Sequence, residues 1–315
     1  LTVVPGIRVD SHSSGEEYAT SVKVSDSAFP TTKFSKTTVN PRIAIKYELT
    51  PSLVLRANVG TGFRAPYGFS EDLHLCSGSP RVWKSSNLKG ERAISYNLSA
   101  DYYAKKYQFS INIFRTNLKD KIQFSPADDE VKKFGYSYQW ENVDDAYVQG
   151  VELGAKANLF RNFNAGINWT FNQGRFKHER ADWSDPNDET VKEFPQRLQY
   201  AKDSRNISRF PAMTGDIDLD YTPGTWTFSL TSSLQGKMYI DYNSEDNGAT
   251  SKIKKTNTFM IFNCRAAKRF GTCTVYAGAK NIFSYIQDEK HTDDAAFMYA
   301  PVYGATWYVG LSVKL

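Results

Sequence analysis

Hydrophobic and polar residues alternate with a period of two over long stretches of this 315-residue sequence, and this alternation constrains its fold most. In the final stretch, TWYVGLSVKL, Trp307, Val309 and Leu311 share one face, while Tyr308 and Ser312 share the other. Successive side chains of a β-strand point to opposite faces, so this period predicts strands with one apolar and one polar face. Helical spacing of apolar residues is scarce. The sequence therefore predicts an all-β protein.

About twelve stretches follow this pattern, and they are long. They cover residues 1–10, 39–49, 52–63, 91–104, 107–118, 147–159, 163–175, 210–222, 225–237, 256–269, 272–284 and 301–315. Strands of soluble sheets usually have about five or six residues, whereas a tilted strand that crosses a bilayer needs about 9–11. The lengths therefore favour strands that span a membrane.

The connections between these stretches alternate between short and long. Short turns, LTPS, AKKY, LFRNF, TPGT and RFGT, are each followed by a long polar loop. We expect the long loops at 11–38, 64–90, 119–146, 176–209, 238–255 and 285–300. Tight turns on one side and long loops on the other are the arrangement of an outer-membrane barrel, in which the long loops face outward.

A soluble β-sandwich or β-propeller is the main alternative, because its strands also alternate. Sandwich strands are shorter, however, and their loops are not systematically long at one end. Aromatic residues near the predicted strand ends are typical of the girdles at membrane interfaces. These are Tyr102, Tyr103, Tyr107, Phe160, Phe163, Tyr221, Trp226 and Phe270. We therefore predict a transmembrane antiparallel β-barrel.

Four segments carry a family resemblance. GTGFRAP, which ends at Pro66, is followed by the segment Asn87–Glu91; NVDDAYVQGVEL begins at Asn142, AGAKNIFSY begins at Ala277, and the last strand closes the series. In this order, at strand ends, they resemble the TonB-dependent outer-membrane receptors, with an F-R-A-P stop and an N-P-x-L-x-P-E-type segment. The second segment departs from the pattern, since Leu88 follows Asn87 directly and Gly90 stands where a proline is common.

The resemblance implies a barrel of about 22 strands plugged by an N-terminal globular domain. Residues 1–315 would then be a partial outer-membrane β-barrel domain, the C-terminal half, without the plug domain and the N-terminal strands. It further implies active import of a metal chelate, haem or a ferric siderophore, across the bacterial outer membrane. The implied partners are the TonB energy-transducing complex, which acts through the absent plug, outer-membrane lipid and the small chelate. A surface lipoprotein is a further candidate partner, and no nucleic acid is expected.

The stretch between the F-R-A-P stop and Asn87 holds the candidate ligand-binding residues. In haem-type receptors of this family a ligating histidine lies in this interval, so the resemblance makes His74 the candidate axial ligand of haem iron. Aromatic rings offer flat contacts to a macrocycle or siderophore, and guanidinium groups bind its carboxylates. The candidate set is Arg64, Tyr67, Phe69, His74, Arg81 and Trp83. Packing within the loops is the alternative role for the aromatic residues, and an ordinary solvated loop residue is the alternative for His74.

Charged residues on the predicted polar faces would line the lumen and anchor the plug. They are Arg8, Arg42, Lys46, Arg56, Glu152, Lys156 and Lys314. The run Asp216, Asp218, Asp220 resembles a calcium motif, but period two places all three on one strand face, where lumen arginine or lysine such as Arg56 and Lys156 would meet them.

Two cysteines, Cys264 and Cys273, fall on adjacent strands and on one face. A two-residue turn at Lys268 and Arg269 would place them opposite each other, and a four-residue turn would separate them by four residues, so a disulfide stays open. We expect Cys76 to be a lone loop thiol or to pair with a cysteine outside this chain.

Enzyme functions find little support. The four histidines are scattered over four predicted loops, and no G-x-S-x-G, H-E-x-x-H or G-K-[ST] motif occurs. Gly60 and Gly62 alternate along a strand, so we expect them to let a molecule approach the wall closely rather than to hold phosphate. Cobalamin or an oligosaccharide is the alternative cargo. A passive porin or an adhesive barrel is the alternative function.

Overall fold

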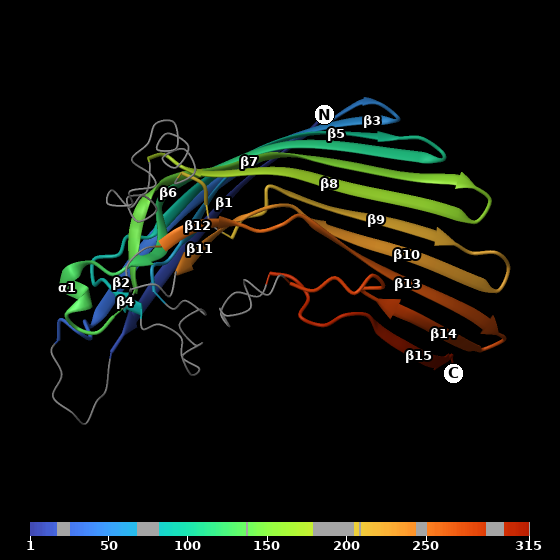
Figure 1. Cartoon of the computed structure of the whole chain (residues 1–315). Helices are drawn as coiled ribbons and strands as arrows, with labels where there is room; N and C mark the ends of the chain where they lie inside the picture. The colour runs from blue at the N-terminus through green and yellow to red at the C-terminus, as the bar shows by residue number, and fades with distance from the viewer. Residues whose placement is uncertain are drawn as a thin grey trace, which may run out of the picture.

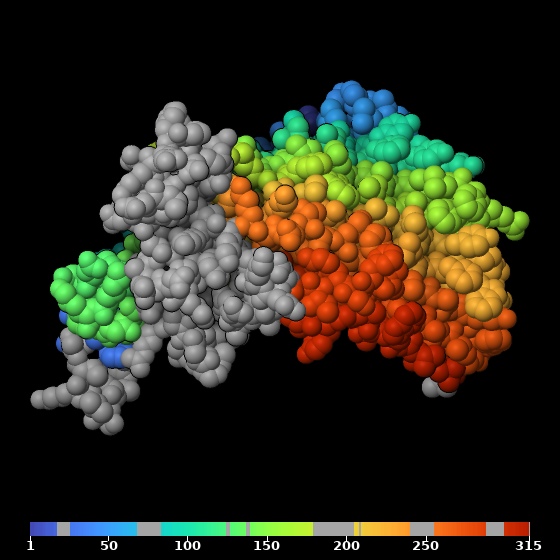
Figure 2. All heavy atoms as spheres, viewed as in Figure 1, coloured from blue at the N-terminus to red at the C-terminus, as the bar shows by residue number. Residues whose placement is uncertain are grey.

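The computed structural model describes residues 1–17, 26–67, 82–136, 138–178, 205–207, 209–243, 251–287 and 299–314. Twelve strands form one antiparallel meander, in which each strand pairs with the next one along the wall. They are β1 (Thr2–Glu16), β2 (Thr32–Thr50), β3 (Leu53–Arg64), β5 (Glu91–Tyr103), β6 (Tyr107–Pro126), β7 (Tyr138–Phe160), β8 (Phe163–Phe176), β9 (Met213–Tyr221), β10 (Trp226–Gln235), β13 (Phe259–Phe270), β14 (Cys273–Lys280) and β15 (Thr306–Val313). The strands follow one another around a curved wall in chain order (Figures 1 and 2).

The sheet does not close on itself within the described residues. β1 and β15 stand at its two edges. The twelve predicted strands and their antiparallel order are confirmed, because every predicted stretch overlaps one strand of this meander. Among the described residues, no helix is both long enough and apolar enough to cross a membrane.

Alternation gives the wall one apolar and one polar face. Val9 and Val39 are direct cross-strand partners with 63% and 62% exposure, and Val309 on β15 has 77% exposure. Such exposure of aliphatic side chains is unfavourable in water but suits contact with lipid. The opposite face carries Arg42, Arg56 and other polar residues. We therefore assign the apolar face to the bilayer and the polar face to the lumen.

Short turns gather at one end of the wall, where aromatic rings also collect. The Phe160 and Phe163 rings stack 4.7 Å apart beside one turn, and the Trp226 and Phe228 rings lie 5.6 Å apart beside another. At the other end stand α1 (Asp129–Lys132), β4 (Val82–Lys84) and the hairpin of β11 (Tyr239–Asn243) and β12 (Ser251–Lys255) (Figure 1). This asymmetry matches the predicted arrangement, with the short turns on the periplasmic side.

Several strands continue well into the segments that we expected to be loops. The loops predicted at 11–38 and 119–146 are partly strand, because β1 ends at Glu16, β2 begins at Thr32, β6 ends at Pro126 and β7 begins at Tyr138. Above the lipid both faces of a strand meet polar surroundings, so the ladder continues without the alternation that reveals a strand in the sequence. A register shift between Leu118 and Lys121, where Asp120 has a φ of 54°, marks the upper part of β6.

Cys264 and Cys273 are both free. Cys264 lies opposite Ala279, and Cys273 lies opposite Phe270, across a turn at residues 271–272. The turn and the register differ from both alternatives considered above. The two cysteines are six positions out of register, which corresponds to roughly 20 Å along a strand, so they do not form a disulfide.

Candidate ligand-binding site

The candidate ligand-binding segment leaves the wall at β3 and returns through β4. Arg64 is the last residue of β3 and is exposed, Tyr67 is buried, and Trp83 lies in β4 and is half-buried. Three other candidates lie outside the described residues: Phe69, His74 and Arg81. The structure therefore shows where the segment begins and ends, at the rim on the long-loop side.

Tyr67 fixes the start of the segment. Its ring belongs to a buried cluster that contains Leu88, Ile122 and Trp140, and its hydroxyl donates a hydrogen bond to the Ser85 carbonyl oxygen at 2.8 Å. Burial raises the pKa of the Tyr67 phenol, so the hydroxyl stays a donor at physiological pH. This hydrophobic cluster ties the residues after β3 to the upper parts of β6 and β7.

Trp83 fixes the end of the segment against a second cluster. Its indole N–H donates to the Ser27 carbonyl oxygen at 3.0 Å. The ring packs against the cluster of Ala127, Val131 and Tyr136. In α1, the main-chain N–H of Val131 donates to the capping Asp128 side chain at 2.9 Å. Trp83 thus contributes to a compact rim built from three different connections.

A buried ion pair sits beside Trp83. The Lys84 ammonium lies 2.6 and 2.8 Å from the two carboxylate oxygens of Glu16, and the Lys84 side chain is only 8% exposed. β4 also adds to the wall as a parallel neighbour of β7, with Trp83 opposite Gln139. Sequence reasoning missed this pair, because residues 68 apart in the chain give no local signal. Both ends of the 68–81 segment are therefore anchored.

Two of the segments that carry the family resemblance meet at the rim. The Lys89 main-chain N–H donates to Asn142 Oδ1 at 2.8 Å, and Asn142 Nδ2 donates back to the Lys89 carbonyl oxygen at 3.0 Å. Asn142 Nδ2 also donates to the Asp120 carbonyl oxygen at 2.8 Å. Glu91 accepts a hydrogen bond from the Ile122 main-chain N–H at 3.1 Å. These contacts give the polar residues at the two strand openings a structural role, because they join neighbouring connections of the rim.

The lumen face carries paired charges along the wall. Arg8 pairs with Asp10 at 2.7 Å, and Lys46 pairs with Glu48 at 2.6 Å. The Asn112 side-chain amide donates to Glu152 at 2.9 Å. Two of these pairs each lie within one strand, and the third joins β6 to β7. Polar groups are therefore present on the lumen face of several strands.

The three aspartates lie on one face of β9 as expected, but among the described residues no ion pair joins them to an arginine or a lysine. Arg56 lies on β3 and pairs with Asp101, whereas the aspartate run lies on β9, which does not neighbour β3 in the sheet. Lys156 and Asp218 stand in one cross-strand row, separated by Gly166, whose missing side chain leaves the space between them. In the part of the chain that the structure describes, no three His, Cys, Asp or Glu side chains are grouped to hold a metal ion.

Two of the four histidines lie among the described residues. His12 lies within β1, so the position that we expected to be in a loop is in a strand. Its ring centroid is 5.7 Å from that of Phe63. His178 follows β8, and its Nδ1 lies 3.1 Å from Asp144 Oδ1. Both contacts are structural.

Comparison with known proteins places these features in a family. Residues 1–282 match the family model described as TonB dependent receptor-like, beta-barrel. A vitamin B12 transporter, BtuB of Photobacterium profundum, is 26% identical over 266 residues, which are 82% of this chain and 36% of that protein. A ferric enterobactin receptor of Pseudomonas aeruginosa is 27% identical over 151 residues, 42% of this chain and 20% of that receptor.

Solved structures agree on the fold. The unliganded ferric citrate transporter FecA superimposes with a TM-score of 0.67 at 19% identity, over 98% of this chain and 42% of that one. The chain thus spans less than half the length of the proteins it matches.

Proposed function

This chain belongs to the family of TonB-dependent receptor β-barrels, and on that premise we propose that it is part of a receptor that actively imports a metal chelate. Its location is the bacterial outer membrane, and its family consists of transporters rather than enzymes. The cargo that we propose is haem or a ferric siderophore. Energy would come from the TonB complex, and release would occur through the lumen.

The observation that carries this proposal is the two-faced wall. Its outward face is aliphatic and aromatic, while its inward face carries Arg8–Asp10, Lys46–Glu48 and further polar pairs. A wall of this kind suits a polar passage through lipid. We further propose that residues 1–315 are a partial barrel domain and that a longer protein supplies the remaining strands and the plug. The open edges at β1 and β15 support this.

We propose that the segment between β3 and β4 contacts the cargo from outside. The candidate residues are Arg64, Tyr67, Phe69, His74, Arg81 and Trp83, with His74 as the ligand of iron if the cargo is haem. The anchoring of Tyr67 and Trp83 supports the proposal, because it keeps both ends of the segment at the rim. A segment held at both ends loses less conformational entropy when a ligand binds.

Cobalamin is a second candidate cargo. The support is specific, since a vitamin B12 transporter matches 82% of this chain. A surface lipoprotein that delivers cargo stays a prediction.

Uptake by the full-length receptor tests the proposal. A strain without the receptor gene is grown under iron limitation with haem, ferric siderophores or cobalamin, and uptake is measured with and without the TonB complex. We expect one cargo to require both the receptor and TonB. Uptake that survives loss of TonB would indicate a passive porin and overturn the proposal.

His74→Ala tests the haem assignment in the full-length receptor. We expect haem to bind at least about tenfold more weakly, about 1.4 kcal/mol, because the axial ligand is lost. His178→Ala is the matched control, because His178 already contacts Asp144. If both variants bind haem as the parent does, His74 is not a ligand.

A further inference from the structure

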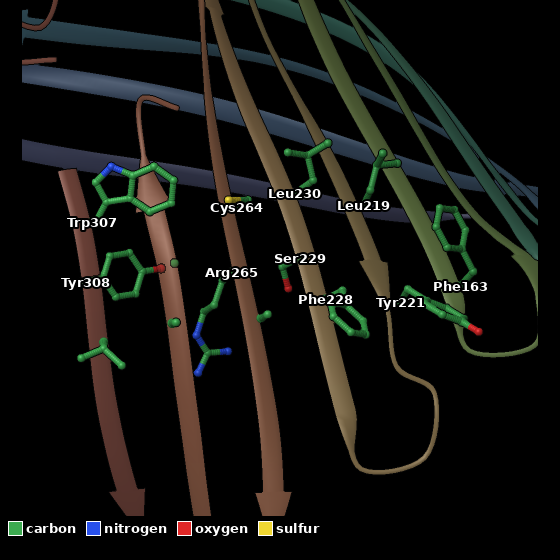
Figure 3. Close-up of a pocket in the computed structure, with 14 residues that line it drawn as sticks. Phe163, Leu219, Tyr221, Phe228, Ser229, Leu230, Cys264, Arg265, Trp307 and Tyr308 are labelled. Carbon is green, nitrogen blue, oxygen red and sulfur yellow. The ribbon is translucent and has the colours of Figure 1, made fainter. Parts of the chain in front are cut away.

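An apolar groove of about 780 Å³ crosses the wall over β8, β9, β10, β13, β14 and β15 (Figure 3). One cross-strand row runs along it from Tyr221 through Phe228, Ala266 and Ala277 to Val309. Aromatic rings stand at one end of this row and a valine at the other, and two alanines stand between them. The groove exists because small residues on β13 and β14 lie between taller neighbours on either side.

The groove opens on the face that we assigned to lipid. Val309 and Trp307 line one side of it, and they are 77% and 76% exposed. The groove also lies near the short turns, since Phe228 is two residues from the start of β10 at Trp226. Two residues of a strand span about 7 Å, so the groove begins in the leaflet next to the periplasm.

A cation stands at the foot of the groove. Lys268 follows Ala266 by two residues on β13, so both side chains share one face, and it lies directly opposite Trp226. Its ammonium lies 4.7 Å from the Trp226 ring centroid and 5.1 Å from that of Phe270. No carboxylate among the described residues forms an ion pair with Lys268. Arg269 follows at the turn and is exposed.

We propose that this groove is a binding site for one phospholipid of the periplasmic leaflet, with an acyl chain over Ala266 and Ala277 and the phosphate at Lys268. An acyl chain matches the nearly continuous apolar lining, and an anionic headgroup matches the unopposed ammonium between two rings. A second copy of the chain would cover the same apolar surface but would leave the Lys268 charge in an apolar interface without a partner, which is costly. The site is independent of the imported cargo.

Lipid retention by the full-length receptor tests the site. The receptor is placed in nanodiscs that contain equal amounts of phosphatidylglycerol and phosphatidylethanolamine, then extracted in mild detergent, and the lipid that stays bound is measured by native mass spectrometry. We expect one phosphatidylglycerol per receptor. Lys268→Glu should lower its retention roughly fivefold, since one lysine near an anionic surface contributes about 1 kcal/mol, and Lys268→Arg should retain it.

Two further variants separate the site from general attraction. Ala277→Phe fills the middle of the groove and should lower retention of both lipids. Lys105→Glu changes an exposed lysine in the turn between β5 and β6, away from the groove, and should leave retention unchanged. Heat-modifiable electrophoretic mobility shows that each variant folds.

Three outcomes would overturn the proposal. In the first, neither Lys268→Glu nor Ala277→Phe lowers retention. In the second, Lys105→Glu lowers it as much as Lys268→Glu, which would mean unspecific attraction. In the third, a receptor dimer appears that Ala277→Phe dissociates, which would make a second copy the occupant.

Discussion

The wall and the rim of this molecule are stabilised in different ways. In the wall, neighbouring strands pair with each other, and apolar side chains face lipid instead of packing in a buried core. In the rim, small clusters around Trp140 and Val131 bury side chains against one another, and a lysine is buried with its carboxylate partner. We infer that stability is spread over many ladder contacts in the wall and concentrated in a few residues at the rim.

Trp140→Ala should produce the largest effect. Trp140 is 6% exposed and packs with Tyr67 and Ile122, so its truncation leaves a cavity and should cost about 3–5 kcal/mol. Because the cluster lies at the rim, the loss should appear as faster hydrogen exchange and proteolysis between β6 and β7. The wall should stay intact, with unchanged heat-modifiable mobility.

Leu98→Ala is the matched change in the wall. Leu98 is 58% exposed on the lipid face, where lipid chains fill the space left by truncation. We expect no faster exchange and a cost of about 1–2 kcal/mol, because only the transfer of apolar side-chain atoms into lipid is lost and no cavity remains. If Leu98→Ala lowers the stability as much as Trp140→Ala does, the inference that stability is concentrated at the rim is wrong.

The sequence predicts the wall far better than the rim, and the two regions show why. Val309 and Leu311 face lipid while Tyr308 and Gly310 face the lumen, so the bilayer imposes a pattern on the sequence itself. Above the lipid that constraint ends. The sequence of the upper parts of β6 and β7 therefore resembles a loop, although these parts belong to the longest ladder of the wall.

Rim contacts join residues that are distant in the chain, so no local sequence pattern predicts them. Lys84 forms an ion pair with Glu16, and the Tyr136 hydroxyl donates to the Ala28 carbonyl oxygen at 2.6 Å, although these two residues are 108 positions apart in the chain. The role of Tyr67 also depends on such partners, because the same residue type suits ligand contact and loop packing. Its burial and its hydrogen bond to Ser85 are packing contacts, and its contact with cargo stays a prediction.

Two ion pairs of equal length provide an intermediate test. Lys84–Glu16 and Lys46–Glu48 both measure 2.6 Å, but the Lys84 side chain is 8% exposed and the Lys46 side chain is 43% exposed. Lys84→Ala leaves a half-buried carboxylate without its partner and should cost about 2–3 kcal/mol, slightly less than for a fully buried pair. Lys46→Ala should cost at most about 1 kcal/mol.

Hydrogen exchange and the dependence of stability on salt distinguish the two ion pairs. Hydrogen exchange at β4 should rise in Lys84→Ala and stay unchanged in Lys46→Ala. Raising the ionic strength should weaken the exposed pair and barely affect the buried one. Equal losses in both variants would mean that burial at the rim adds nothing to that ion pair.

The smallest effect concerns the cysteines, and it tests the register of the wall. Phe270 and Cys273 are direct cross-strand partners, whereas Cys264 lies six positions away from Cys273 in register. Phe270→Cys should therefore form a disulfide with Cys273 under mild oxidation, since partners in adjacent strands lie within about 7 Å.

The parent protein should form no intramolecular disulfide between Cys264 and Cys273 under the same conditions, and maleimide should label both when the barrel is unfolded without reductant. The engineered crosslink closes a loop of only a few residues within a hairpin that is already paired, so we expect it to change stability by less than about 1 kcal/mol. A bridge between Cys264 and Cys273 in the parent would require β13 to slide by six residues against β14. That shift would move Lys268 into the connection between the two strands, and Ala266 would no longer lie opposite Ala277, so the groove would lose both its floor and the cation at its foot.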